Sequence, residues 1–145
     1  MKQAYDALDP EAIEEAWYVS GFGYDSFFRS YLRGNFTYVR TPFGNTRRVE
    51  QAKGLRQGGM ESPFLFNLVM SHVLGRINAY FGDEVLISYA DDLVLQCENR
   101  WMMQDALVEL GRLLENVGLK VNMDKSELVC SNAPDFNYFF PGRAE

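Results

Sequence analysis

The feature that most constrains this chain is a pair of adjacent aspartates inside an apolar run, ISYADDLVL at positions 87–95. The flanking segments, VLISYA and LVLQC, are strand-like, so a β-hairpin with Asp91 and Asp92 at its joint is predicted. Two-residue hairpin loops prefer Asn-Gly or Asp-Gly, and neighbouring carboxylates repel each other unless a cation neutralises them. The pair is therefore either a site for a hard divalent cation, above all Mg²⁺, or a solvated polar turn.

Length and composition fit one folded domain. The chain has 145 residues, of which 47% are hydrophobic and 14% aromatic, enough to bury a core. No apolar run approaches the roughly 20 residues that cross a bilayer, and the charged N-terminal segment is unlike a signal peptide. We therefore expect an intracellular protein, nuclear or cytoplasmic, with no membrane contact.

Hydrophobic periodicity predicts helices alternating with short strands. Asp9-Pro10 followed by acids is typical of a helix start, and Asn99 with Gly118 frames another helix. The stretch from Phe64 is apolar nearly all round and is expected to be buried. The expected helices span 10–21, 24–32, 64–81 and 100–117, and the expected hairpins or strands span 35–51, 85–97 and 119–130. The fold class is α+β, with a small antiparallel sheet packed on two or more helices.

Basic residues are concentrated in one segment of a chain whose net charge is −6. Seven of the fourteen lie together with a single acid, Glu50, and with interleaved aromatic residues. Such a segment either steers a polyanion or is a hairpin edge that arginines keep soluble. The seven are Arg29, Arg33, Arg40, Arg47, Arg48, Lys53 and Arg56, and the aromatic residues are Phe36, Tyr38 and Phe43.

Cysteine and histidine offer no second candidate for a metal site. Cys97 and Cys130 each lie in an apolar segment and are expected to be buried free thiols. His72 is the only histidine, and we expect a tolerated or hydrogen-bonded interior residue.

Four motifs occur in a characteristic order around the acidic pair. They are AYD at 4–6, GLRQGGMESPFLFN at 54–67, YADD at 89–92, and GLKVN at 118–122 followed by KSE at 125–127. Together they resemble the motifs of reverse transcriptases, in the style of retrotransposons without long terminal repeats and of group II intron enzymes. The resemblance covers residues 1–130 and implies a polymerase palm-like fold, followed by a tail, 131–145, that reads as a weak strand or the start of the next element.

The resemblance also assigns roles to individual residues. It implies that Asp91 is a catalytic metal ligand and Asp92 its more peripheral partner, serving two-metal nucleotidyl transfer with Mg²⁺ or, alternatively, Mn²⁺. Tyr5 matches the residue beneath the incoming sugar, or else simply packs in the core. The implied nucleotide-binding residues are Tyr5, Gln57, Gly58 and Lys125, and the candidate nucleic-acid contacts are Arg56, Arg47 and Arg48. Gly58 could equally be a turn glycine and Lys125 a surface lysine.

The implied partners are an RNA template, a DNA primer and deoxynucleoside triphosphates, and nothing points to a specific protein partner. The family's first palm motif begins with an aspartate five residues before the aromatic, which from Tyr5 falls just before Met1. The resemblance therefore implies a palm fragment without fingers or thumb, and we expect this chain alone to lack polymerase activity.

Two other classes of protein compete with this interpretation of the sequence. Other palm enzymes, such as RNA-templated RNA polymerases and nucleotide cyclases, favour Gly-Asp-Asp or Gly-Gly-Asp-Glu-Phe hairpins and would not bring the motif at 54–67. A repurposed, non-catalytic module that binds nucleic acid or serves as a scaffold remains open at this point.

Overall fold

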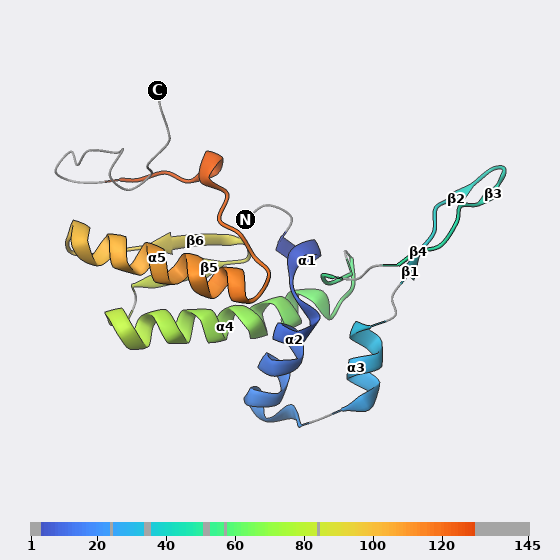
Figure 1. Ribbon diagram of the computed structural model, residues 1–145, viewed down its shortest axis with the longest axis horizontal. Coiled ribbons are helices and arrows are strands. Elements are labelled where there is room, and N and C mark those ends of the chain that lie inside the picture. The colour runs from blue at the N-terminus through green and yellow to red at the C-terminus, as the bar shows by residue number, and fades with distance from the viewer. Residues whose placement is uncertain are drawn as a thin grey trace.

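A central helix organises the computed structural model, which describes residues 4–23, 25–33, 36–50, 53–56, 58–83 and 85–129. Helix α4, Ser62–Phe81, contacts α2 on one side and α5 and strand β5 on the other (Figure 1). The helices are α1 (Ala4–Ala7), α2 (Pro10–Trp17), the π-helical turn η1 (Tyr18–Phe22), α3 (Ser26–Leu32), α4, α5 (Arg100–Asn116) and the 3₁₀ turn η2 (Met123–Lys125).

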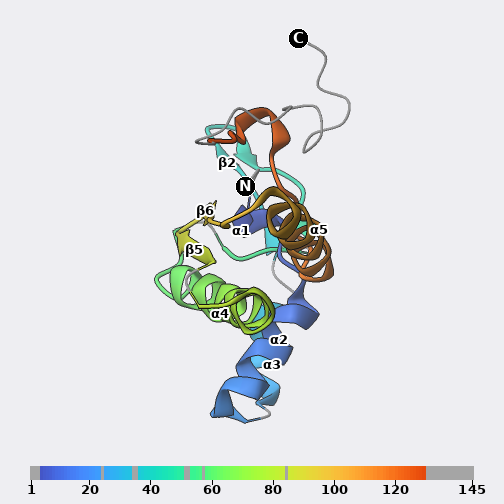
Figure 2. The same cartoon turned by 90° about the vertical axis from the view of Figure 1, so that its left-hand side faces the viewer.

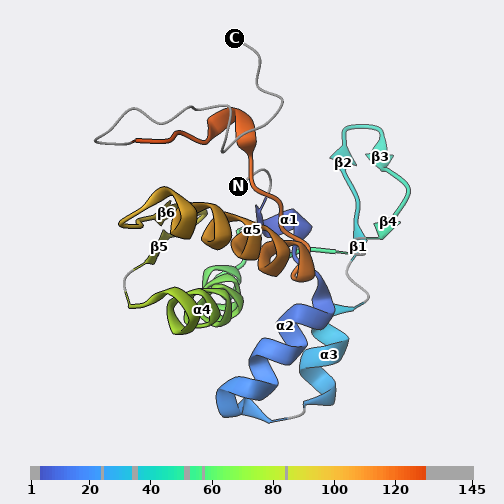
Figure 3. The ribbon, with the colours of Figure 1, turned by 60° about the vertical axis from the view of Figure 1, so that its left-hand side comes forward.

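Every strand pairing in the described residues is antiparallel and two-stranded. The strands are β1 (Phe36–Thr37), β2 (Arg40–Thr41), β3 (Gly44–Asn45), β4 (Val49–Glu50), β5 (Leu86–Tyr89) and β6 (Asp92–Leu95). Hairpin β5–β6 packs on α4 and α5, whereas β1–β4 and β2–β3 form one long hairpin that projects from the body (Figures 1 and 3). This mixture of helices and antiparallel pairs confirms the α+β class.

The core lies where α4 meets its neighbours, and Figure 2 shows the arrangement of these elements around α4 from its end. Its fully buried side chains come from segments far apart in the sequence: Leu8, Ile13, Phe66, Ile77, Leu114 and Leu119 are each 0% exposed. Burying side chains of this size stabilises the fold by about 1.5–3 kcal/mol each. The buried positions of α4 recur every three or four residues, while Phe64 and Tyr80 are exposed. The prediction that this helix is buried all round was therefore wrong.

The three predicted helix caps had different outcomes. Asn99 caps α5 as predicted, because its side-chain oxygen accepts a hydrogen bond from the Met102 amide at 2.9 Å. Gly118 follows the helix with φ +85°, and the Leu119 amide donates to the Leu114 carbonyl at 2.8 Å, which makes a Schellman motif. Asp9 makes no side-chain cap on α2, since its carboxylate instead binds Lys53 Nζ at 2.6 Å.

Three further expectations can be compared with the structure. The strand expected after Gly118 is absent over residues 119–129, where the only regular element is η2; these residues pair with no strand in the described part of the chain. Residue 130 and the tail 131–145 lie outside the described residues. His72 is hydrogen-bonded as predicted, with Nε2 3.2 Å from Ser20 Oγ. Cys97 is a half-buried free thiol, and burial raises its pKa.

No helix in the described part of the chain is long and apolar enough to cross a membrane.

Gly75 provides a first test of the packing in α4. It lies inside the helix, and a Cβ added there would meet no neighbouring atom within 4 Å. Because glycine has a lower helix propensity than alanine, Gly75→Ala is expected to raise the free energy of unfolding by about 0.5–1 kcal/mol. Urea denaturation followed by far-ultraviolet circular dichroism measures this change, and a loss of stability would contradict the open environment of Gly75.

Candidate active site

The acidic turn, residues 89–92, joins β5 to β6. The register pairs Tyr89 with Asp92, so the two-residue loop is Ala90-Asp91 and Asp92 is the first residue of β6. The prediction that Asp91 and Asp92 form the joint was thus wrong by one residue. Pairing of Leu86 with Leu95 and of Ile87 with Val94 fixes this register through the apolar side chains rather than through the aspartates.

Ala90 has the backbone conformation that glycine usually supplies. Its φ is +52°, the only positive φ at a non-glycine residue in the described chain. A positive φ at the first loop position resembles a type II′ turn, in which glycine is preferred there. An alanine in this region costs about 1–2 kcal/mol, and such local strain is concentrated at functional turns.

Relieving this strain should stabilise the hairpin. Ala90→Gly is expected to raise the free energy of unfolding by about 0.5 kcal/mol, because the gain from a relaxed φ exceeds the entropy that glycine adds to the unfolded chain. Chemical denaturation of the two proteins measures the difference. A decrease in stability would mean that Ala90 is not strained in the folded protein.

The hairpin has a packed face and an open face. Leu86 is buried at 2% exposure, and its amide donates a 3.0 Å hydrogen bond to Asn78 Oδ1 of α4, while Leu93 and Leu95 pack against the core. Tyr89 on the open face is 84% exposed. Asp91 and Asp92 are both exposed as well, so helices α4 and α5 support the hairpin from behind and its carboxylates face solvent.

The donor chemistry of the acidic turn fits a hard divalent cation. Carboxylate oxygens are the ligands that Mg²⁺ prefers, and protein sites for Mg²⁺ often supply only one or two of them beside water and substrate phosphates. Asp91 and Asp92 meet this requirement and are accessible. Within the ranges that the structure describes, no group of three or more His, Cys, Asp or Glu residues is arranged to hold a metal ion.

A glycine-rich loop, residues 54–61, leads into α4, and its first residues are hydrogen-bonded to the segment of α1. The Gly54 amide donates to the Leu8 carbonyl at 2.8 Å, and the Leu55 amide donates to the Tyr5 carbonyl at 2.6 Å. At the other end, buried Ser62 donates from Oγ to the Arg56 carbonyl at 2.6 Å. Both ends of the loop are thereby fixed, which leaves the exposed Arg56 side chain on a rigid backbone.

The structure describes three of the four predicted nucleotide-binding residues. The half-buried ring of Tyr5 stacks on Phe66 with centroids 4.9 Å apart, which supports the core-packing alternative for that ring. Gly58 has φ +80° and open space around it, so the turn conformation accounts for glycine there. Lys125 is exposed on η2, and Gln57 lies outside the described residues. Their proposed contacts with a nucleotide stay predictions.

Among the described residues, three of the seven clustered basic side chains have acidic partners. Arg29 Nε lies 3.1 Å from Glu14 Oε2, and Arg33 reaches the carboxylates of Glu14 and Glu11 at 3.1 and 3.0 Å. Lys53 binds Asp9, which raises the Lys53 pKa through a hydrogen bond and its charge. Arg29 and Arg33 thus join the α3 segment to α2, and Lys53 joins the start of the glycine-rich loop to the residue before α2. The charge pattern alone did not reveal this structural role.

Arg47 and Arg48 lie on the projecting hairpin, which we call the arm (residues 36–50). Both are exposed, and the Arg48 guanidinium lies over the Phe36 ring, 3.5 Å from its centroid. Figures 1 and 3 show the arm apart from hairpin β5–β6. The structure thus separates the candidate nucleic-acid contacts on the arm from the acidic turn.

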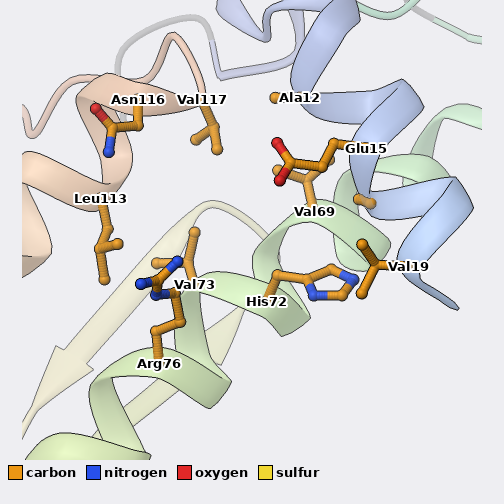
Figure 4. Close-up of a pocket in the computed structure, with 11 residues that line it drawn as sticks. Ala12, Glu15, Val19, Val69, His72, Val73, Arg76, Leu113, Asn116 and Val117 are labelled. Atoms are coloured by element: carbon orange, nitrogen blue, oxygen red, sulfur yellow. The ribbon is translucent and has the colours of Figure 1, made fainter.

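A cleft between three helices of the described chain does not contain the predicted site. It has a volume of about 500 Å³ and lies between α2, α4 and α5, with Val69 and Val73 among its apolar residues and Glu15, His72 and Arg76 among its polar ones (Figure 4). None of the predicted site residues lines it. The sequence predicted Gly118 only as a helix cap, and it did not predict the close backbone contacts that Gly54 and Gly118 make with the segment of α1.

The order of motifs, the exposed acidic turn and the α+β fold agree with a match over nearly the whole chain. Residues 1–139 match the family described as "Reverse transcriptase (RNA-dependent DNA polymerase)", and the chain belongs to this family.

The relatives found among curated proteins come from retrotransposable elements. The chain is 31% identical over 133 residues to the Pol polyprotein of the type-2 element R2DM of Drosophila melanogaster, covering 86% of this chain and 13% of that protein. It is 32% identical over 131 residues to the R2 Pol polyprotein of Nasonia vitripennis, covering 83% of this chain and 13% of that protein. It is 27% identical over 139 residues to the R2 Pol polyprotein of Popillia japonica, covering 87% of this chain and 19% of that protein. The predicted likeness to retrotransposons without long terminal repeats is confirmed, and the chain spans less than a fifth of these relatives.

Proposed function

We propose that the chain contributes to RNA-templated DNA synthesis as the palm-like part of a reverse transcriptase. The observation that carries this proposal is the position of Asp91 and Asp92. They lie on an exposed, strained turn whose hairpin is fixed on α4 and α5, inside a segment that matches the family. A rigid support with exposed carboxylates is what a preorganised metal site requires.

Asp91 and Asp92 would hold the divalent cation. When bound, Mg²⁺ or Mn²⁺ would activate the primer 3′-hydroxyl and neutralise charge on the departing pyrophosphate. Asp91 occupies the loop itself and would be a direct ligand, whereas Asp92 begins β6 and would be its more peripheral partner. Tyr5, held against Phe66, would contact the sugar of the incoming nucleotide, and Lys125 its phosphates.

The substrates proposed are an RNA template, a DNA primer and deoxynucleoside triphosphates. The glycine-rich loop would approach the template and nucleotide with Gln57 and Gly58, and Arg56 would contact a phosphate. Because Ser62 anchors the Arg56 carbonyl at 2.6 Å, the guanidinium extends from a fixed point rather than from a mobile loop. Arg47 and Arg48 would add phosphate contacts on the arm.

Primer extension tests the proposed function. The protein encoded by the longest open reading frame that contains this sequence is incubated with primed RNA, deoxynucleoside triphosphates and Mg²⁺. Extension should require the metal, stop on chelation and resume with Mn²⁺, and a primed DNA template of the same sequence serves as the comparison. Failure to extend on RNA, or extension only with ribonucleotides, would overturn the proposal. That the 145-residue chain alone does not extend a primer stays a prediction for the same assay.

A non-catalytic nucleic-acid-binding module is the second candidate, and the arginines of the arm are the observation that favours it. Binding of RNA by this module would fall with rising salt and would be unchanged by Asp91→Asn. Metal-dependent extension in the preceding assay decides between the two candidates.

A further inference from the structure

The arm is a preorganised projection with a β-bulge in the middle. Phe36 pairs with Glu50 and Thr37 with Val49, whereas Arg40 pairs with Asn45 and Thr41 with Gly44. Between these two ladders, two residues on one strand face three on the other, so one extra residue lies within 46–48. A bulge of this kind redirects side chains, and here it lies in the segment that carries Arg47 and Arg48.

Hydrogen bonds fix the tip of the arm. Thr41 Oγ1 donates to the Gly44 carbonyl at 2.7 Å and accepts from the Phe43 amide at 3.3 Å. Below it, the Thr46 amide donates to the Val39 carbonyl at 2.9 Å, and the Val39 amide donates to Thr46 Oγ1 at 2.8 Å. Phe43 is consequently held at the end of the arm with its side chain 100% exposed. The ring is presented to solvent by an ordered turn.

Aromatic rings and arginines share the arm. Tyr38 is 49% exposed and Phe36, beneath the Arg48 guanidinium, is 42% exposed. The arm has three arginines and one glutamate, while the rest of the chain has eleven basic and nineteen acidic residues. It is therefore a positive element on an acidic protein, and its charge is complementary to a polyanion.

We propose that the arm binds single-stranded RNA, with unpaired bases stacked on Phe43 and Tyr38 and phosphates bound by Arg40 and Arg47. Stacking requires base faces that a duplex does not offer, and interleaved rings and cations are the usual composition of single-strand binding surfaces. The choice of RNA rests on the proposed function, because a reverse transcriptase must hold its template. The proposal that bases stack on Phe43 and Tyr38 depends only on the observed geometry of the arm. Arg48, besides its proposed phosphate contact, holds its guanidinium over the Phe36 ring and orients that ring.

Fluorescence anisotropy with a labelled, unstructured RNA oligonucleotide tests this proposal over a series of salt concentrations. Phe43→Leu keeps an apolar side chain but removes the aromatic face, and it should weaken binding about tenfold while the salt dependence stays unchanged. Phe43→Trp should restore or strengthen binding. Arg47→Gln should instead reduce the slope of log K against log salt by about 0.7, the value for one phosphate on a single strand.

Tyr80→Leu is the matched control, since Tyr80 is an 80% exposed aromatic residue on α4, outside the arm. It should leave binding unchanged, and a duplex of the same sequence should be insensitive to Phe43→Leu. Equal binding by wild type and Phe43→Leu, or an equal loss in Tyr80→Leu, would overturn stacking at the arm. Tighter, Phe43-dependent binding of single-stranded DNA would overturn the assignment to RNA. Because no step uses metal, primer extension can fail while these results stand, so the two proposals fail separately.

Discussion

Replacing Asp91 with asparagine is expected to lower kcat/KM for primer extension by about three orders of magnitude. A divalent cation stabilises transition-state charge by several kcal/mol, and a neutral amide of the same shape is a much poorer ligand. Asp92→Asn should cause a smaller loss, because Asp92 lies in β6 opposite Tyr89 rather than in the loop. The protein from the longest reading frame that contains the chain is compared with its two variants.

Binding and stability measurements separate a ligand role from a structural one. Both substitutions should weaken Mn²⁺ binding, measured by water-proton relaxation, and should leave the free energy of unfolding unchanged or slightly higher, because they remove a like-charge neighbour. Asp105→Asn provides the control, as an exposed carboxylate on α5. If it impaired extension as much as Asp91→Asn did, the effect would be one of net charge and the acidic turn would not be the metal site.

The sequence predicted the acidic turn and the family, but it misplaced the hairpin loop by one residue. The prediction relied on the two aspartates as loop residues, whereas the register follows the cross-strand pairs of Ile87 with Val94 and Leu86 with Leu95. Loop conformation adapts to this register, and Ala90 takes the positive φ. The packing of these apolar pairs therefore determined the position of the loop, although Ala90 is unfavourable at its first position.

Caps and charge clusters show the same limit of local reasoning. Asn99 was predictable because its partner is three residues away in the same helix turn. The role of Asp9 was not predictable, because its partner Lys53 is far along the chain and becomes a neighbour only after folding. Likewise Arg29 and Arg33 belong to the basic segment in sequence but to the α2–α3 interface in space. A charge pattern shows how many basic residues a segment contains, whereas the fold determines which of them form ion pairs with acidic residues.

Two glycines form the tightest backbone contacts around α1, and both should be intolerant of a side chain. A Cβ on Gly54 would lie 2.5 Å from Asp6 Cα, and one on Gly118 would lie 2.4 Å from the Ala7 carbonyl oxygen. Both glycines also have φ +85°. Gly54→Ala and Gly118→Ala are therefore each expected to lower the free energy of unfolding by about 2–4 kcal/mol, from strain in φ together with overpacking.

Gly58→Ala separates the two causes, because Gly58 has φ +80° but no neighbour within 4 Å of an added Cβ. Gly58→Ala should lower the free energy of unfolding by only about 1 kcal/mol, which is the contribution of the positive φ alone. Urea denaturation of the three variants measures all the changes, and equal losses in Gly54→Ala and Gly58→Ala would show that close approach is unimportant. Because Gly54 and Gly118 clamp the segment that carries Tyr5, partial relaxation at either glycine should also displace Tyr5 from Phe66 and weaken nucleotide binding before the domain unfolds.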